Sequence, residues 1–502
     1  MRSPFCMGEG SWGDLGVAAR SRSAARNLNH GEKPVGYSLL QAISRSEALP
    51  PKLSARTVPS LFQVLAFLGL VALGCAAVRW QPGLTLSVAG FTCWFAFILI
   101  VLWRFCLVIV GAGRRFGPSS SESHAKSLPE ELPVYSILIA LRHEAGMMPQ
   151  LATSLSALDW PAGRLDILLL IEADDTETMR AARDAAFPTG TRVIRVPPGK
   201  PLTKPRALNY GLARAVGEYL TIYDAEDRPD PQQLKAACAM FEDAPANVLC
   251  LQAPLKATNG ASSWVAAHWA LEYDVQFNLY LPALASWGHP IMLGGTSNHF
   301  RRLDLIAFGG WDAWNVTEDA DLGLRAARLG GQTWRINTPT LESAPETYSV
   351  WFHQRKRWIK GYMQTWLVCM RRPFSLLSEL GFPAWVSLQM TLGASILSAF
   401  LYGPMTLWML AGLIVPAVQV DALSFALFGL GWIASTLGDA LAPGRWRFAR
   451  TLAVVSRPFY WMLQTGAAIM ALYGLAVRPH FWAKTPHQPE QGEAASRADI
   501  EA

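Results

Sequence analysis

The sequence has few charged residues for its length. Only 16% of its 502 residues are Asp, Glu, Lys or Arg, whereas 51% are hydrophobic. Typical soluble domains carry about 25% charged residues, so this composition indicates a membrane protein. The net charge of +6 is mild, and in a membrane protein it is more typical of basic cytoplasmic loops than of nucleic-acid binding.

Paired cysteines and a secretory signal are also missing. The 7 Cys form no Cys-x-x-Cys pair, and Cys75, Cys93 and Cys106 lie within apolar runs. This argues against a disulfide framework and against a cysteine zinc site. Residues 1–60 are polar and contain no apolar segment of signal-peptide length. We expect them to form a flexible cytoplasmic leader.

Long apolar runs flank the middle of the chain. Leu61–Val78 and Leu84–Trp103, with a continuation to Gly111, predict a transmembrane hairpin over residues 61–111. The two arginines that follow it favour a cytoplasmic exit. Past residue 372 we expect an interfacial segment, a transmembrane region of three or four spans and a polar tail. Their ranges are 373–384, 385–478 and 479–502.

The number of C-terminal spans depends on one run. Trp385–Val418 is long enough for one tilted helix or, if it breaks at Gly403-Pro404, for two short ones. A single crossing would leave the C-terminus outside the cell, and two crossings would return it to the cytoplasm. Ala422–Ala442 and Phe459–Val477 are the further spans.

Residues 132–372 alternate strand-like and helical segments. The strand-like runs are solid blocks of Ile, Leu and Val, which is typical of parallel strands covered by helices on both faces. In such sheets ligands bind beyond the carboxyl ends of the strands. The predicted strands are Val134–Ala140, Leu165–Ile171, Thr191–Val196, Glu218–Tyr223 and Asn247–Gln252. The predicted helices are Pro149–Leu158, Thr178–Ala186, Pro205–Val216 and Pro231–Phe241.

Acidic residues follow three of these strands. Any one group is compatible with a solvated loop, but three groups on one sheet edge require cations or ligand donors. Hard oxygen ligands of this kind suit Mg²⁺ or Mn²⁺, which bind one or two carboxylates plus substrate phosphates. We therefore predict a metal site at Asp224 and Glu226, with Asp227 replacing or assisting Glu226. The acids are Glu144, Glu172, Asp174, Asp224, Glu226 and Asp227.

Two further motifs lie downstream. Thr317-Glu318-Asp319 reads as a helix start, with Thr317 as N-cap and acids in the first turn. A helix start is also a rigid place for a base, and Asp319 is the candidate that takes a proton from an attacking hydroxyl. Gln354-Arg355-Lys356-Arg357-Trp358 is compatible with a basic helix on anionic lipid. However, Arg forks also match diphosphate oxygens, and an indole packs on a sugar face.

In this order the three motifs resemble those of the processive family 2 glycosyltransferases, which include cellulose synthases, hyaluronan synthases and bacterial exopolysaccharide or β-glucan synthases. The resemblance covers residues 132–372 and the flanking spans. It implies an α/β GT-A domain, Rossmann-like with a mostly parallel sheet, inserted between N- and C-terminal transmembrane helices.

The resemblance also implies roles for individual residues. Asp224 and Glu226 match the metal-binding Asp-x-Asp, with Glu in the last place, and Asp319 matches the catalytic base. Residues 294–299, which end in His299, resemble a loop near the acceptor, although a simple tight turn is the alternative. The substrate-binding positions that it implies are Glu144, Glu172, Asp174, Lys204, Asn209, Glu318, Gln354, Arg357 and Trp358.

The activity implied is inverting transfer of a hexose from a UDP-sugar, expected to be UDP-glucose, to a growing β-linked polysaccharide that is exported through the spans. Transfer of one sugar to a lipid carrier is the first alternative, and a non-catalytic membrane component with a relic domain is the second. Expected partners are the donor, a polysaccharide or lipid-linked acceptor, membrane lipids and export or periplasmic subunits, but no nucleic acid. The expected location is the bacterial inner membrane, with the catalytic domain in the cytoplasm.

The sequence also departs from the family pattern. No Phe-x-Val-Thr-x-Lys-like gating segment follows Trp358, and no C-terminal regulatory domain is recognisable. We therefore do not expect the regulation found in bacterial cellulose synthase. Residues 482–487 resemble a cytoplasmic ending of related synthases, which favours two crossings by Trp385–Val418.

Overall fold

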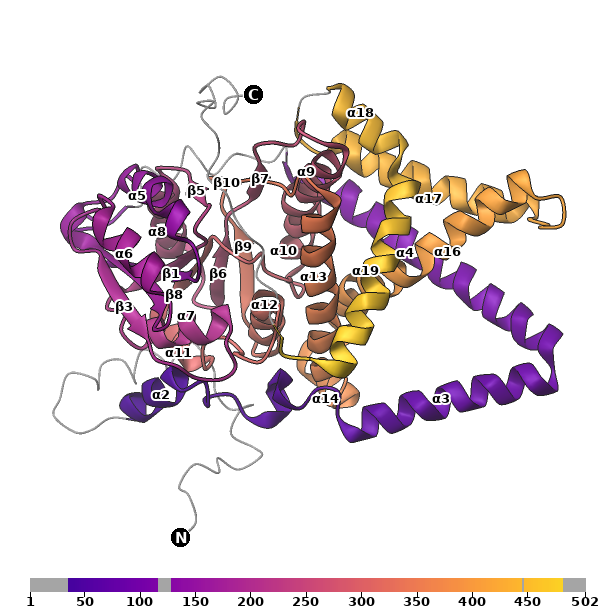
Figure 1. The fold of residues 1–502 in the computed structure, drawn as a ribbon, viewed down its shortest axis with the longest axis horizontal. Helices are drawn as coiled ribbons and strands as arrows, with labels where there is room; N and C mark the ends of the chain where they lie inside the picture. The colour runs from indigo at the N-terminus through magenta and orange to yellow at the C-terminus, as the bar shows by residue number, and fades with distance from the viewer. Residues whose placement is uncertain (1–34, 116–127, 445–446, 482–502) are drawn as a thin grey trace, which may run out of the picture.

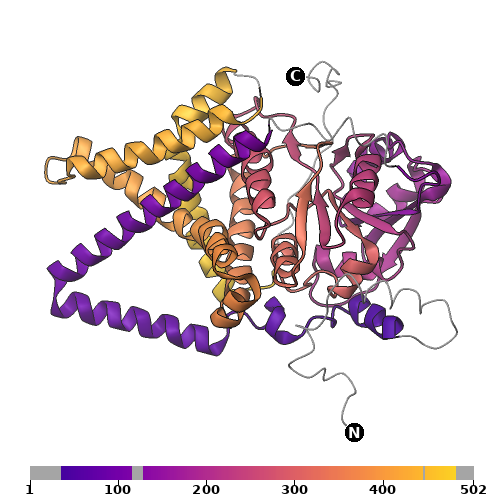
Figure 2. The same ribbon diagram turned by 180° about the vertical axis from the view of Figure 1, so that it is seen from behind.

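The computed structural model describes residues 35–115, 128–444 and 447–481. The polar tail from residue 482, the ending at 482–487 and the first part of the leader lie outside the described residues. The described chain consists of an α/β domain and a group of long helices that extends from one side of it (Figures 1 and 2).

The α/β domain is built on a seven-stranded sheet with the strand order β3-β2-β1-β4-β8-β6-β9. Strand β8 is antiparallel to its neighbours, and the other pairings are parallel. The predicted mostly parallel sheet is confirmed, and all five predicted strands are present. The strands are β1 Tyr135–Leu141, β2 Leu165–Glu172, β3 Arg192–Val196, β4 Tyr219–Tyr223, β6 Val248–Gln252, β8 Asn298–Arg301 and β9 Gln332–Arg335.

Both faces of this sheet are buried, which explains its solid apolar strands. Successive side chains of a strand point to opposite faces. Leu138 accordingly belongs to one core with Leu208 and Leu212 of α7, while Ile137 belongs to the other core with Leu234 of α8. The helices of the domain are α5 Met148–Ser156, α6 Thr176–Asp184, α7 Lys204–Leu212, α8 Gln233–Asp243, α9 Trp264–Val275, α10 Leu281–Trp287, α11 Arg302–Ala307, α12 Glu318–Arg328, α13 Tyr348–Cys369 and α14 Pro373–Leu380.

A second, three-stranded sheet lies beside the first one. Its order is β5-β10-β7, and these short strands had no recognisable pattern in the sequence. A π-helical segment, Gln276–Tyr280, joins α9 to α10. The strands of the second sheet are β5 Arg228–Pro229, β7 Leu255–Ala257 and β10 Thr340–Glu342.

The end of the expected leader is folded onto the α/β domain. Helix α2, Val35–Ser44, packs against α7, and its Ile43 is fully buried. Further along, Ser54 Oγ and the Ala55 backbone N–H both donate to the Asp312 carboxylate, at 2.9 and 2.5 Å. Residues 35–60 are therefore part of the fold, in contrast to the expected flexible leader, because their few apolar residues find a core to fill.

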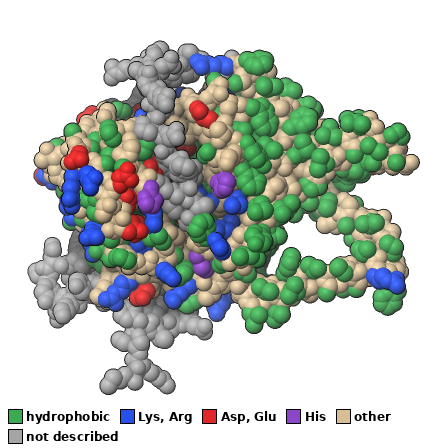
Figure 3. Space-filling view, in the orientation of Figure 1, with side chains coloured by type: hydrophobic (Ala, Val, Ile, Leu, Met, Phe, Trp, Pro, Cys, Tyr) green, Lys and Arg blue, Asp and Glu red, His purple; other side chains and the backbone are tan. Residues whose placement is uncertain are grey.

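Five helices among the described residues are long and apolar enough to cross a membrane. Hydrophobic side chains cover this part of the surface, whereas charged side chains gather on the α/β domain (Figure 3). In Figure 1, α3, α4, α16 and α17 point away from the domain, while α19 runs along its edge beside α13. The five are α3 Leu61–Trp80, the Pro82–Gly113 part of α4, Phe382–Ile414 (α15, a π-helical segment and α16), α17 Ala422–Leu441 and α19 Arg457–Val477.

The run after residue 385 forms one continuous helix instead of the two favoured above. Pro404 lies inside α16, Ala394–Ile414, without ending it, and proline is tolerated in membrane helices. Gly403 marks a close helix contact here, because a Cβ at this position would lie 2.4 Å from Thr465 Oγ1 of α19.

Both ends of α19 are attached to the α/β domain. At its start, Trp264 Nε1 of α9 donates to Ser456 Oγ at 2.6 Å. Beyond its end, Gln364 Nε2 and Lys360 Nζ of α13 donate to the carbonyl oxygens of Pro479 and Phe481, at 3.0 and 2.7 Å. The described chain thus ends on the α/β domain.

Candidate active site

A cavity of about 1580 Å³ opens beyond the carboxyl ends of the parallel strands and continues between the long helices. Its walls hold most of the residues that the sequence singled out. Residues from the strand ends and from both downstream motifs thus line one cavity. The predicted residues in its walls are Glu144, Glu172, Lys204, Asp224, Glu226, Glu318, Asp319, Gln354, Arg357 and Trp358.

Lys204 lies among the acids at the end of β4. Its Nζ forms an ion pair with the Asp224 carboxylate and donates to the Gly295 carbonyl at 2.8 Å. Burial lowers the pKa of Lys204, but the negative charges of Asp224 and Glu318 outweigh burial and raise it. The structure thus keeps a cation where the carboxylates converge.

Asp227 is the buried member of this acidic group. It accepts hydrogen bonds from the Asp224 backbone N–H, at 2.7 Å, and from Thr296 Oγ1. Burial, and then the charges of Asp224 and Glu226, raise its pKa well above the ordinary value. Asp227 therefore holds the loop after β4 in place, whereas Asp224 and Glu226 line the cavity.

The helix start at Glu318 places two acids at the cavity wall. Thr317 occupies the N-cap position, but its side chain makes no capping hydrogen bond, so the predicted capping role is wrong. Burial and the neighbouring Asp319 raise the pKa of Glu318 to about 7. Burial also raises the pKa of Asp319, although the Ala320 N–H and the charge of Lys204 oppose the rise. A carboxyl with a raised pKa is a better proton acceptor, as a general base requires.

Helix α13 is fixed directly to the segment before Asp319. Gly361 approaches so closely that a Cβ there would lie 2.3 Å from Thr317 Oγ1. One turn later, Gln364 Oε1 accepts from the Val316 N–H at 3.1 Å, and Thr365 Oγ1 accepts from Asn315 Nδ2 at 2.8 Å. The basic-aromatic motif, on the preceding turns of the same helix, is thereby held beside Asp319.

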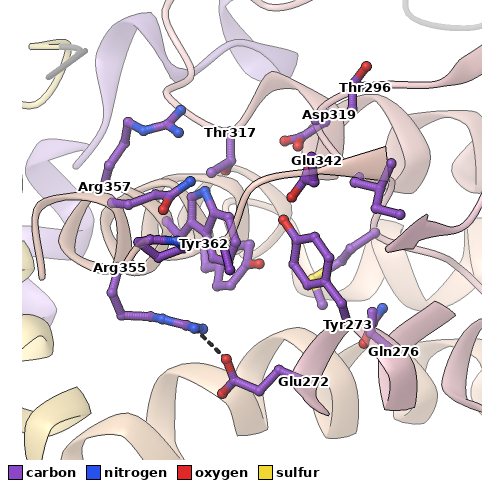
Figure 4. A pocket seen from close by; sticks show the side chains of 18 of the residues that line it. Glu272, Tyr273, Gln276, Thr296, Thr317, Asp319, Glu342, Arg355, Arg357 and Tyr362 are labelled. Atoms are coloured by element: carbon purple, nitrogen blue, oxygen red, sulfur yellow. Dashed lines mark hydrogen bonds and ion pairs between the residues drawn. The ribbon is translucent and has the colours of Figure 1, made fainter. Parts of the chain in front are cut away.

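The residues of the α13 motif have different surroundings: several line the cavity, and Arg355 also packs against its neighbours. Trp358 lines the cavity, and its ring lies 4.7 Å from that of Trp269 and 6.4 Å from that of Tyr273. Arg355 forms an ion pair with Glu272, and its guanidinium carbon lies 5.0 Å from the Trp358 ring centroid. Figure 4 shows this ion pair below Arg357 and Tyr362. Arg355 thus orients the indole, and Arg357 lines the cavity, where its charge acts on Glu318 and Asp319.

Three residues singled out by the sequence lie elsewhere. Asp174 is exposed and pairs with Arg142 at 3.4 Å. Asn209 fastens the turn at Trp311, donating to its carbonyl at 2.8 Å and accepting from its N–H at 2.9 Å. His299 is a fully buried residue of β8, and burial lowers its pKa to about 3. None of the three is among the cavity-lining residues.

Glu342 and Tyr273 are among the polar residues of the cavity wall that the sequence did not point to. Burial raises the pKa of the Tyr273 phenol. The negative charge of Glu342 and the hydrogen bond that Tyr273 donates to Glu342 raise it further. Glu342 ends β10, and in Figure 4 it faces the same space as Asp319. An acid after a recognisable strand would have been noticed, but β10 is only 3 residues long.

The acidic group fits a divalent cation. Its two cavity-lining carboxylates, Asp224 and Glu226, are hard oxygen donors, and Lys204 shows that the group attracts positive charge. In the described part of the chain no three His, Cys, Asp or Glu residues form a closed metal site. An open arrangement of one or two carboxylates is how Mg²⁺ is held together with substrate phosphates.

Comparisons with known proteins agree with this geometry. The model for "Glycosyl transferase family 2" matches residues 136–300, and that for "Glycosyl transferase family group 2" matches residues 219–420. The chain therefore carries a family 2 glycosyltransferase domain, and this domain includes the strand-end acids, Asp319 and the motif of α13.

Curated relatives extend the comparison. A probable glycosyltransferase, YdaM, of Bacillus subtilis is 26% identical over 49% of this chain and 59% of its own length. The beta-monoglucosyldiacylglycerol synthase of Synechocystis is 23% identical over 71% of this chain and 75% of its own. The catalytic subunit of the UDP-forming cellulose synthase of Pseudomonas fluorescens is 26% identical over 60% and 42%.

A solved structure is also similar. The mannosyltransferase PcManGT from Pyrobaculum calidifontis, in complex with GDP-Man and Mn²⁺, has a TM-score of 0.45 and 16% identity. The superposition covers 77% of this chain and 99% of that one. Among the relatives above, the matched stretch spans less than two thirds of the Bacillus and Pseudomonas proteins.

Proposed function

We propose that this protein is a membrane-bound inverting glycosyltransferase that transfers a hexose from a UDP-sugar, with UDP-glucose as the first donor to test. One observation carries the proposal: a single cavity joins the strand-end acids, the base candidate Asp319 and the α13 motif to the space between the membrane helices. A donor bound by the domain and an acceptor arriving from the membrane would meet there.

The residues of the cavity suit one displacement. Asp319 takes the proton of the acceptor hydroxyl, whose oxygen forms a bond to the anomeric carbon. The bond from that carbon to the diphosphate oxygen breaks, and the configuration inverts to give a β-linkage from an α-linked donor. Arg357 binds the diphosphate through its guanidinium fork, and Trp358 offers the acceptor sugar an aromatic face.

Asp224 and Glu226 would hold a Mg²⁺ or Mn²⁺ ion. Such an ion supplies charge neutralisation for the leaving diphosphate. Lys204, now paired with Asp224, lies where it can bind a diphosphate oxygen once the carboxylate has another cation. Glu144 and Glu172 line the same side of the cavity and are the proposed contacts to the nucleoside.

Two acceptors remain candidates. A growing β-linked polysaccharide is the first, in keeping with the motifs that resemble cellulose and hyaluronan synthases and with the Pseudomonas relative. A membrane lipid is the second, favoured by a specific observation. The cavity reaches Tyr402 and Trp461, and both belong to a buried cluster with Phe97 and Met405. Aromatic and apolar side chains at this end of the cavity suit a lipid acceptor.

We further propose that the catalytic domain lies in the cytoplasm, at the inner membrane of a bacterium. Because both ends of α19 contact the α/β domain, α19 lies along the membrane surface, and α3, α4, α16 and α17 cross. Ala417, between α16 and α17, would then face outside. An impermeant maleimide should label Ala417→Cys in intact cells but label Arg478→Cys only after lysis. The reverse pattern would refute this topology.

The test of function uses the full chain purified from membranes. A panel of radiolabelled UDP-sugars is offered with Mg²⁺ or Mn²⁺, and the product is analysed for linkage and length. Transfer of a hexose in a β-linkage is expected. Long products identify a polysaccharide synthase, and single additions to a lipid identify the alternative. Failure to hydrolyse or transfer any UDP-sugar would overturn the proposal in favour of a relic domain.

A further inference from the structure

The membrane end of the cavity contains a polar group that the transfer reaction does not use. It includes Arg104 of α4, and Ser398 and Tyr402 of α16. Arg104 Nη2 donates to Ser398 Oγ at 3.1 Å, and its guanidinium carbon lies 5.6 Å from the centroid of the Tyr402 ring. The arginine is thus turned into the cavity and does not reach out toward the lipid.

Three other cations that line the cavity are held in ion pairs. Arg457 is paired with Asp439, Arg355 with Glu272 and Lys204 with Asp224. Within the described residues, Arg104 has no carboxylate within ion-pair distance, and it contacts the Ser398 hydroxyl and the Tyr402 ring instead. An arginine inside a membrane span is costly unless a partner compensates its charge.

A second observation points to a ligand at the same place. The Tyr402 side chain is only 5% exposed, and its hydroxyl has no hydrogen-bond partner among the described residues. The indole N–H of Trp103, next to Arg104 and also lining the cavity, is buried without a partner as well. Buried polar groups are normally hydrogen-bonded, so these donors indicate a missing acceptor of hydrogen bonds.

The depth of the group fits the level of lipid phosphates. Gly111 of α4 packs directly on Leu279 of the α/β domain, because a Cβ there would lie 2.1 Å from the Leu279 carbonyl oxygen. Arg104 lies two helical turns before this contact, or about 10 Å along the helix axis. The Trp103 ring also lies 5.7 Å from that of Trp287 of α10, and tryptophans collect at the membrane interface.

We propose that Arg104, Tyr402, Ser398 and Trp103 form a subsite for the phosphate group of a membrane lipid, the phosphate that anchors a lipid-linked acceptor. The inference rests on the proposed function and specifies its acceptor. The phosphate would accept charge-assisted hydrogen bonds from Arg104 and bonds from the Tyr402 hydroxyl and the Trp103 indole. The acceptor sugar would then extend toward Trp358.

Lipid retention tests this subsite without any nucleotide sugar. The full chain is reconstituted in phosphatidylcholine vesicles that contain either a polyprenyl phosphate or phosphatidic acid, and bound lipid is counted by native mass spectrometry. The unaltered protein should retain one phosphate-bearing lipid. Because charge-assisted hydrogen bonds are lost, Arg104→Gln should lower this retention by about ten-fold or more. Tyr402→Phe should lower it less, and Arg104→Lys should keep part of it.

The matched control is Arg79→Gln, which removes an exposed arginine at the end of α3 and should leave retention unchanged. Preferential retention of polyprenyl phosphate assigns a carrier lipid, and preferential retention of phosphatidic acid assigns a phospholipid. Displacement by inorganic phosphate alone, without lipid retention, would overturn the lipid source. If Arg104→Gln and Tyr402→Phe each retain as much lipid as the unaltered protein, the subsite itself is refuted. An unaltered protein that transfers no sugar would defeat the proposed function but leave this measurement valid.

Discussion

The two ends of the cavity differ in the chemistry of their walls. The end at the strand carboxyl termini is crowded with carboxylates, and the cations there are paired with them. The membrane end holds hydroxyls, aromatic rings, the Asp439–Arg457 ion pair and Arg104, whose partners are uncharged. In the proposed reaction, the first end would bind the diphosphate and accept the proton, and the second end would receive the acceptor. Variants at the first end should affect every acceptor, and variants at the second should affect the choice of acceptor.

The largest effect is expected at the base. Asp319→Asn removes the proton acceptor but keeps the shape of the side chain, so transfer should fall by about 10² to 10⁴-fold while UDP binding persists. Initial rates and UDP affinity measure the two properties separately. Asp174→Asn is the control, because Asp174 is exposed and lies outside the cavity wall. Undiminished transfer by Asp319→Asn would refute the assignment.

Next in size is the effect of the metal. Removal of divalent ions by a chelator should lower the transfer rate and weaken UDP binding, and Mg²⁺ or Mn²⁺ should restore both, because Asp224 and Glu226 would hold an ion that neutralises the diphosphate. Asp224→Asn should raise the metal concentration required. Calorimetry of UDP binding, with and without metal, reports this directly. Equal UDP affinity in both conditions would speak against a metal site.

The contact between α13 and the base segment gives a test of how the site is assembled. Gly361→Ala places a methyl group against Thr317, where a Cβ would lie 2.3 Å from its hydroxyl oxygen. Overpacking of this kind should lower the stability by about 1–3 kcal/mol. Gly69→Ala in α3 is the matched control, since a Cβ there meets nothing within 4 Å. Gly361→Ala should unfold at a lower temperature than Gly69→Ala. Equal melting temperatures would show that α13 can shift away from Thr317 without loss of stability.

A smaller effect concerns pH. Burial and the neighbouring Asp319 raise the pKa of Glu318 to about 7, and burial also raises the pKa of Asp319. Transfer needs Asp319 deprotonated, so the rate should decline as the pH falls, and the decline should begin at a higher pH than for an ordinary aspartate. Glu318→Gln removes a neighbouring negative charge, which should lower the pKa of Asp319 and move the acid limb to lower pH. If the acid limb of the Glu318→Gln profile stays at the same pH, the charge of Glu318 does not influence the titration of Asp319.

The sequence predicted the parallel core and most of the catalytic end. Solid apolar strands such as Leu165–Glu172 identify themselves because both faces are buried, and acids after them must meet at one edge. It did not predict β8 or β10, since strands of 3 or 4 residues carry too little pattern. Asn209 was misplaced because a motif position does not reveal that the side chain is already bonded to Trp311.

The membrane part shows the opposite balance. Apolar length alone located the candidate spans α3, α4, α17 and α19, but it suggested a break at Pro404, which lies inside one continuous helix. Packing positions α19: Gly403 lets it approach α16, and hydrogen bonds tie both ends of α19 to the α/β domain. The inside position of the C-terminus stays a prediction.

The sequence by itself determined the kind of chemistry, because carboxylates, an arginine fork and an indole at fixed strand and helix ends admit few uses. Only the tertiary structure decided which side chains share a cavity, that Arg355 braces Trp358, and that Arg104 faces inward with Tyr402. The physical reason is that residue identity and hydrophobic periodicity can be read from the sequence. Burial, charge pairing and unsatisfied hydrogen-bond donors arise only when distant segments of the chain come into contact.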